Sequence, residues 1–202
     1  MLGHIAAFEW RYQVKSPVFW VGCLIFFLLT FGAVTSDQIQ IGSRGNVHIN
    51  APFAILQTVT IMSLFTGFIA VAMVAGVVIR DDETGFAPIL RSTRIGKWDY
   101  LVGRFAGAVA AAFLVLAVIP LAIQLGVWMP WQDPEKIGPL RPWDYLWVLI
   151  AFALPTLLIT SAVYFALATA TRSLMWTYVG AAAMVVLYIM MRALLRDPRS
   201  MR

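Results

Sequence analysis

From Phe53 to Ile79 the chain reads FAILQTVTIMSLFTGFIAVAMVAGVVI, without one Asp, Glu, Lys or Arg. About 20 consecutive apolar residues in a helix are enough to cross the hydrocarbon core of a bilayer. The polar side chains in the run, such as Gln57, Thr58 and Ser63, are uncharged types that form hydrogen bonds between packed membrane helices. The stretch therefore predicts a membrane-spanning helix that is long enough to tilt.

The composition of the whole chain indicates the same class of protein. Of its 202 residues, 61% are hydrophobic and 12% are charged, and the mean hydropathy is +0.81. Soluble domains have about 45–50% apolar and about 25% charged residues, so a soluble enzyme, a disordered tail and a nucleic-acid-binding domain are excluded. Four further apolar runs cover Val18–Val34, Phe105–Val127, Leu146–Leu167 and Met175–Met191. We therefore expect an all-α polytopic membrane protein with five transmembrane helices.

The basic residues predict the orientation of these helices, because cytoplasmic segments are enriched in Lys and Arg. With the N-terminus inside, the inner set is Arg11, Lys15, Arg80, Arg91, Arg94, Lys97, Arg104 and Arg172, and the outer set is Arg44, Lys136 and Arg141. This distribution favours a cytoplasmic N-terminus. Four arginines near the C-terminus would then lie outside, namely Arg192, Arg196, Arg199 and Arg202. Either the fifth run is no span, or a complete unit has six spans and the chain is truncated at its C-terminus.

The first 16 residues have the pattern of a helix that lies in the membrane interface. One helical face carries Met1, Ile5, Phe8 and Tyr12, and another carries His4, Arg11 and Lys15. Ser16 and Pro17 then fit the N-cap and the first position of the first span. That span is longer than the apolar core of a signal peptide, so we expect it to remain uncleaved.

Small residues and prolines mark the third and fourth runs. Gly103, Gly107 and Ala111 recur every four residues, a spacing that lets helices approach closely. The partner helix could belong to the same chain or to a second copy. Pro120 and Pro155 each remove a backbone donor and are expected to kink their helices.

The sequence contains no motif for catalysis, for a cofactor or for a metal. There is no GxxxxGK[ST] phosphate loop, no HExxH, no GxSxG and no CxxC. One cysteine, Cys23, and two separated histidines, His4 and His48, give little support to a zinc or haem site. We expect a protein that is not an enzyme, and if it moves a substrate, the energy would come from a partner.

The inner segment between the second and third spans is unlike a plain connector. It reads Arg80-Asp-Asp-Glu-Thr-Gly-Phe-Ala-Pro-Ile-Leu-Arg-Ser-Thr-Arg94. Thr84 can cap a short helix with acids near its positive end, and Phe86, Ile89 and Leu90 would then share one face. That apolar face could pack on the membrane surface or on the protein's own spans, or it could dock a cytosolic partner.

This segment resembles the coupling region of type-two ABC exporter permeases, in which an acid-rich turn with Glu-x-Gly leads into a short coupling helix. Further segments are similar to the N-terminal membrane part of large bacterial ABC permeases that are fused to a zinc aminopeptidase-like domain. They are Phe8–Tyr12, Ser16–Trp20, Thr35–Gly42, Asn50–Pro52, Arg80–Gly85 and Ala166–Ser173. The chain ends at Arg202 without such a domain, so no peptidase activity is implied.

The resemblance implies a permease subunit of an ATP-driven transporter in the bacterial cytoplasmic (inner) membrane. Residues 1–202 would form one permease domain, with an interfacial helix at 1–16 and a cytoplasmic coupling loop at 80–100. The expected partners are an ABC ATPase subunit and a second permease half, in a homodimer or a heterodimer. The implied ATPase-coupling residues are Asp82, Glu83, Gly85, Phe86, Ile89, Leu90, Arg91 and Arg94. The alternative is a membrane anchor or assembly platform that transports nothing.

Overall fold

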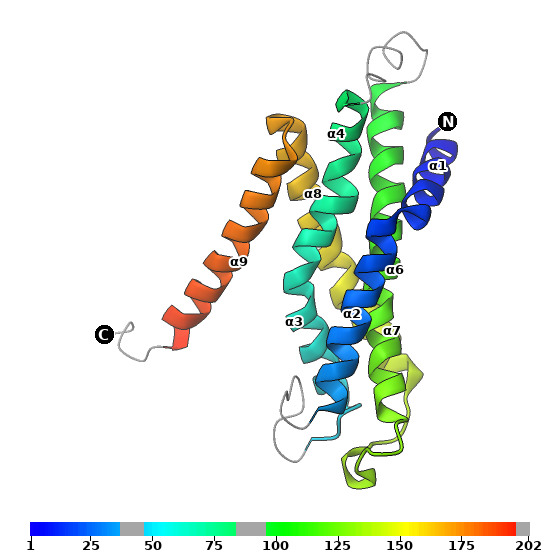
Figure 1. Cartoon of the computed structure of the whole chain (residues 1–202), viewed down its shortest axis with the longest axis vertical. Helices are drawn as coiled ribbons and strands as arrows, with labels where there is room; N and C mark the ends of the chain where they lie inside the picture. The colour runs from blue at the N-terminus through cyan, green and yellow to red at the C-terminus, as the bar shows by residue number, and fades with distance from the viewer. Residues whose placement is uncertain (37–46, 84–95, 197–202) are drawn as a thin grey trace.

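The computed structural model describes residues 1–36, 47–83 and 96–196, which form a helical bundle without a β-strand among them (Figure 1). All elements in these ranges are helical. In chain order they are α1 (Leu2–Lys15), α2 (Pro17–Thr35), α3 (Pro52–Ala70), η1 (Val71–Ala75), α4 (Gly76–Glu83), α6 (Lys97–Val127), η2 (Pro134–Lys136), α7 (Pro142–Val148), η3 (Leu149–Ala153), α8 (Leu154–Thr171) and α9 (Leu174–Arg196).

The five predicted spans are confirmed as helices that are long and apolar enough to cross a membrane, counted within the described residues. They extend over Pro17–Thr35, Pro52–Arg80, Lys97–Val127, Pro142–Thr171 and Leu174–Leu194. The first begins as the sequence predicts, with Pro17 at the first position and the backbone N–H of Val18 donating to Ser16 Oγ at 3.1 Å. The third begins eight residues before the predicted Phe105, so its first two turns carry charged side chains, Arg104 among them.

Helix α6 lies at the centre of the bundle. Its small residues, such as Ala108, Ala111 and Ala112, are fully buried, and so are Val115 and Ile119. Small side chains let the neighbouring helices come close to α6, and α1 and α2 both pack along it. The central position of α6 means that a contact to its first turns reaches the core directly.

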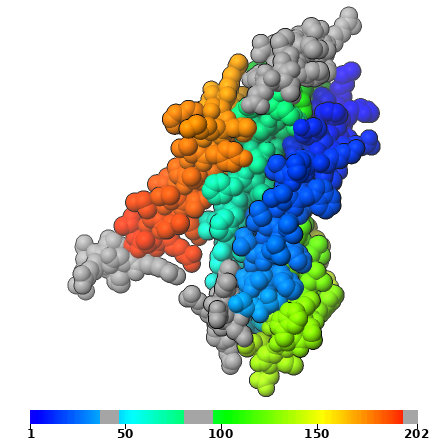
Figure 2. All heavy atoms as spheres, viewed as in Figure 1, coloured from blue at the N-terminus to red at the C-terminus, as the bar shows by residue number. Residues whose placement is uncertain are grey.

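Helix α9 lies at the edge of the bundle. In the most apolar stretch of α9, 11% of the residues are buried, against 61% in that of α6. The C-terminal half of α9 diverges from the other helices (Figure 2). The chain reverses between α8 and α9 at Arg172, which has a left-handed backbone with φ of 48°. Helix α9 then runs from the end of the bundle that holds α1 towards the opposite end (Figure 1). The conflict between five spans and the arginines near the C-terminus, such as Arg192, therefore persists in the fold.

Two spans contain a π-helical turn. The turn η3 in the fourth span ends two residues before Pro155, where the sequence predicts a kink. Pro120 behaves differently, because α6 continues past it as one element with Pro120 buried inside. The turn η1 in the second span has no proline in it or in the helix that follows.

At the end of the bundle opposite α1, the segment before α3 and the segment between α6 and α7 are joined by hydrogen bonds. The Asn50 side chain donates to Gly138 O and accepts from Gly138 N, each at 2.7 Å, and Ile49 N donates to Lys136 O at 2.9 Å. Gln132 Nε2 donates to Val34 O at 2.9 Å. These bonds fix the ends of α2, α3 and α6 on this side of the bundle relative to one another.

Candidate functional site

Only the edges of the predicted coupling segment belong to the described residues. Asp82 and Glu83 occupy the last turn of α4, whereas Gly85, Phe86, Ile89, Leu90, Arg91 and Arg94 lie outside the described residues. The helices on either side of the segment, α4 and α6, end and begin beside each other at the end of the bundle that holds α1 (Figure 1). The candidate site is therefore built from the side chains that hold these two helix ends.

One buried carboxylate on α1 binds both helix ends. The Glu9 side chain is 0% exposed and accepts from Arg80 Nη2 at 2.8 Å through Oε2 and at 3.2 Å through Oε1. Arg104 Nη1 donates to the same Oε2. Arg80 is the last residue of the second span, and Arg104 lies in the second turn of α6. A single acid thus binds residues at both ends of the predicted coupling segment.

Aromatic rings complete the surroundings of the two guanidinium groups. The Arg80 guanidinium lies over the Tyr12 ring at 3.9 Å from its centroid. The Arg104 guanidinium lies 5.3 Å from the Tyr100 ring and 5.8 Å from the Phe8 ring, and its Nε donates to the Tyr100 hydroxyl at 3.2 Å. A buried ion is costly unless it is paired and hydrogen-bonded, and the planar fork of arginine meets that need better than a lysine.

Gln13, one helical turn after Glu9, connects this ion cluster to the middle of the second span. Its Nε2 donates to Glu9 Oε1 at 2.8 Å and to the backbone carbonyl of Met73 at 2.8 Å. Met73 lies in the π-helical turn η1, and its side chain is fully buried. The Gln13 amide therefore adds a hydrogen bond to a buried backbone carbonyl of this turn, and such a bond contributes about 0.5–1.5 kcal/mol to stability.

The glycine pair on α6 is what brings α1 close enough for these bonds. A Cβ on Gly107 would lie 2.4 Å from Ala6 O and 2.9 Å from Glu9 Cβ. A Cβ on Gly103 would lie 3.0 Å from both Ile5 Cβ and Leu2 O. Within this chain the small-residue face therefore packs against α1, which answers the question that the sequence leaves open about its partner helix.

The sequence analysis missed Glu9 and Gln13 as functional residues. It predicts α1 correctly as a helix, but it uses the exposed face of Phe8 and Tyr12, while the side chains that α1 buries are Glu9 and Gln13. A signal was available, since Glu9 is the first acid in the sequence and the next is Asp37. An acid and a glutamine at i and i+4 share a helical face, so their common burial could have been considered.

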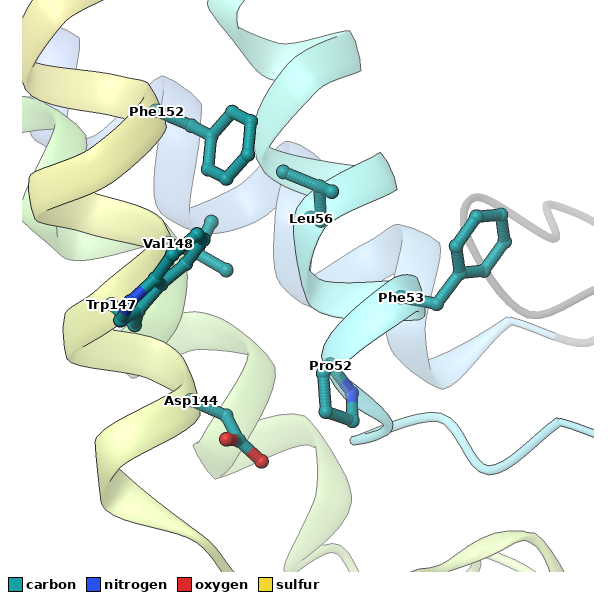
Figure 3. A pocket seen from close by; sticks show the side chains of 7 residues that line it. All are labelled: Pro52, Phe53, Leu56, Asp144, Trp147, Val148 and Phe152. Atoms are coloured by element: carbon teal, nitrogen blue, oxygen red, sulfur yellow. The ribbon is translucent and has the colours of Figure 1, made fainter.

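A second feature lies at the opposite end of the bundle. A shallow pocket of about 190 Å³ separates the first turns of α3 from α7 and η3, and Figure 3 shows Leu56 and Phe152 on its two walls with Asp144 at its rim. Its volume is below the range of about 300–1,000 Å³ that is usual for small-molecule sites.

The tryptophans of this region, such as Trp128 and Trp143, are exposed, as an aromatic belt at the membrane boundary would be. Among the described residues no group of His, Cys, Asp and Glu could hold a metal ion.

Comparison with known proteins identifies the family. A family model described as "ABC-2 family transporter protein" matches residues 4–196. No curated protein and no solved structure matches the chain. Subunits of this family are multi-pass membrane permeases without catalytic activity, and ATP is hydrolysed on a separate ATPase subunit. The chain therefore belongs to the ABC-2 transporter family, as the membrane permease component of an ABC transporter.

Proposed function

We propose that this permease takes up the movement of its ATPase through residues 80–100 and passes it to the second and third spans. The observation that carries the proposal is the Glu9 carboxylate, which binds Arg80 at the start of this segment and Arg104 just after it. Because both residues are held by the same buried group, a displacement of the segment would act on both spans and on α1 together. A plain connector would need no such common anchor.

The residues that contact the ATPase are proposed from the sequence pattern. Phe86, Ile89 and Leu90 would seat in a cleft of the ATPase, with the charged residues of the segment at the rim of that contact. These rim residues are Asp82, Glu83, Arg91 and Arg94, and Gly85 would provide the turn before the helix. ATP binding would then shift the permease between two states through its differential contacts with them.

The wider assembly is part of the same proposal. A second permease half, identical or different, would complete the path across the membrane, and the large exposed apolar surface of α9 leaves room for it beside the lipid. The charge bias of the connections supports a cytoplasmic N-terminus in a bacterial inner membrane. The narrower likeness to permeases fused to an aminopeptidase-like domain rests on the quoted sequence segments alone.

The test uses the permease purified together with its ATPase and reconstituted in vesicles. We expect Phe86→Asp and Leu90→Asp to abolish the stimulation of ATP hydrolysis by the permease without preventing membrane insertion. Leu140→Asp is the matched control, because Leu140 is an exposed apolar residue of the outer connection. Normal stimulation in both segment variants would contradict the proposal, and a stable complex with non-ATPase partners alone would favour the anchor or assembly platform.

A further inference from the structure

The π-helical turn η1 contains no proline, and Gly76 follows it directly at the start of α4. A π turn holds one residue more than the α-helical turn that it replaces, and such turns occur mostly as single insertions in α-helices. The commonest local cause of a break in a helix, a proline, is absent from η1 and from α4. The packing around the turn is therefore a candidate cause.

Helices α6, α8 and α9 pack against η1, and the Gln13 amide of α1 adds a hydrogen bond to its backbone. The Nε2 atom of Gln13 donates to Met73 O across 60 positions of sequence, inside a shell in which Val71, Met73, Val74 and Ala75 are all 0% exposed. A side-chain donor that inserts into the hydrogen-bond ladder of a helix is a known cause of local distortion.

The same helix α1 also fixes the other end of the shifted segment. Arg80 lies in the last turn of α4, and the rotational position that η1 gives to α4 brings its side chain to Glu9. If η1 lost its extra residue and became α-helical, α4 would turn by about 100° and advance by about 1.5 Å. Arg80 would then point away from Glu9. Gln13 and Glu9 are hydrogen-bonded to each other at 2.8 Å. Gln13 binds the backbone of η1 and Glu9 binds Arg80 of α4, so together they fix the rotation of α4 relative to η1.

We propose that Gln13 is a positioning residue that holds the second span in a π register, and that transport involves the release of this register to an α-helical one. This inference rests on the proposed function for its purpose, since the ATPase would trigger the release by pulling Arg80 from Glu9. The register itself is a property of the permease alone. It can therefore be measured without the ATPase.

The exposure pattern of α4 makes the register measurable. Val77 is 1% and Ile79 is 5% exposed, while Val78 between them is half-buried. A rotation by one residue moves each side chain to the position of its neighbour. Residues 77 and 79 would then become more exposed, and residue 78 would become buried. A variant that merely loosened the helix would raise the accessibility at all three positions instead.

The experiment places single cysteines at residues 77, 78 and 79 of the full chain in vesicles, after Cys23→Ser has removed the natural cysteine. A small membrane-permeant thiol reagent should modify the cysteine of Val78→Cys and spare the other two. In the Gln13→Met background we expect the reverse, with residues 77 and 79 modified and residue 78 protected. The matched control is Gln57→Met on the same span, which should keep the original pattern.

An unchanged pattern in the Gln13→Met background would overturn the inference, and so would a uniform increase at all three positions. If that variant does not insert, Arg80→Gln releases the other end of the register and should give the same inversion. A failure of Phe86→Asp to uncouple the ATPase would contradict the proposed function and leave these accessibility results unaffected, so the two failures are distinguishable.

Discussion

The two π-helical turns of this permease differ in what causes them. The turn η3 precedes Pro155, whose ring removes an N–H and clashes with the carbonyl of Ala151, four residues before it. The turn η1 has no such proline, and its carbonyl at Met73 receives a hydrogen bond from Gln13 on α1. Their surroundings differ as well, since Ile150 and Phe152 of η3 are exposed, whereas most side chains of η1 are fully buried.

This difference separates a permanent feature of the backbone from a conditional one. Pro155 lacks a backbone N–H in any conformation, so we expect η3 to persist when the packing around it changes. In our proposal the η1 turn depends on the Gln13 contact and ends when that contact breaks. The conditional turn is also the one that leads to Arg80 and the coupling segment.

The largest expected effect comes from removing the anchor of the conditional turn. Glu9→Leu leaves the buried Arg104 guanidinium and the partly buried Arg80 guanidinium without their carboxylate, and the loss of one partner of a buried pair costs about 3–5 kcal/mol. We expect a large fall in the thermal stability of the purified permease. Glu135→Gln, at an exposed acid of η2, should change it by less than about 0.5 kcal/mol. Equal stability of the two variants would show that Glu9 is not an anchor.

A smaller effect is expected when α1 is pushed away from α6. Gly107→Ala places a methyl group 2.4 Å from Ala6 O, so α1 must shift, at a cost of about 1–3 kcal/mol. Hydrogen exchange should increase in η1 and remain unchanged in η3. Gly32→Ala is the control, because a Cβ there meets nothing within 4 Å. Equal exchange in η1 for both variants would mean that α1 does not support the turn.

The sequence was sufficient for the parts of this fold that depend on local chemistry. The apolar runs predict all five spans, Ser16 and Pro17 predict the start of α2, and Pro155 predicts a distortion that proves to be η3. The third span was predicted too short, because Asp99 and Arg104 interrupt the apolar pattern although the helix includes them.

The candidate site depends on contacts between distant residues, which composition and periodicity do not contain. The glycines of α6 predict a close helix, but only the fold identifies that helix as α1. Glu9 and Arg104 lie 95 positions apart, and each resembles an ordinary charge at the membrane boundary until they are seen together. The predicted docking residues Phe86, Ile89 and Leu90 stay a prediction, since they lie outside the described residues.

The most direct test of the account compares Gln13→Met with Pro155→Ala in the complex of permease and ATPase. Pro155→Ala restores a backbone donor to the permanent turn, and we expect ATP hydrolysis to remain fully stimulated by the permease. Gln13→Met removes the donor to the conditional turn, so the ATPase should still bind while its stimulation is lost. Stimulation that survives Gln13→Met, or that falls equally in both variants, would contradict the account.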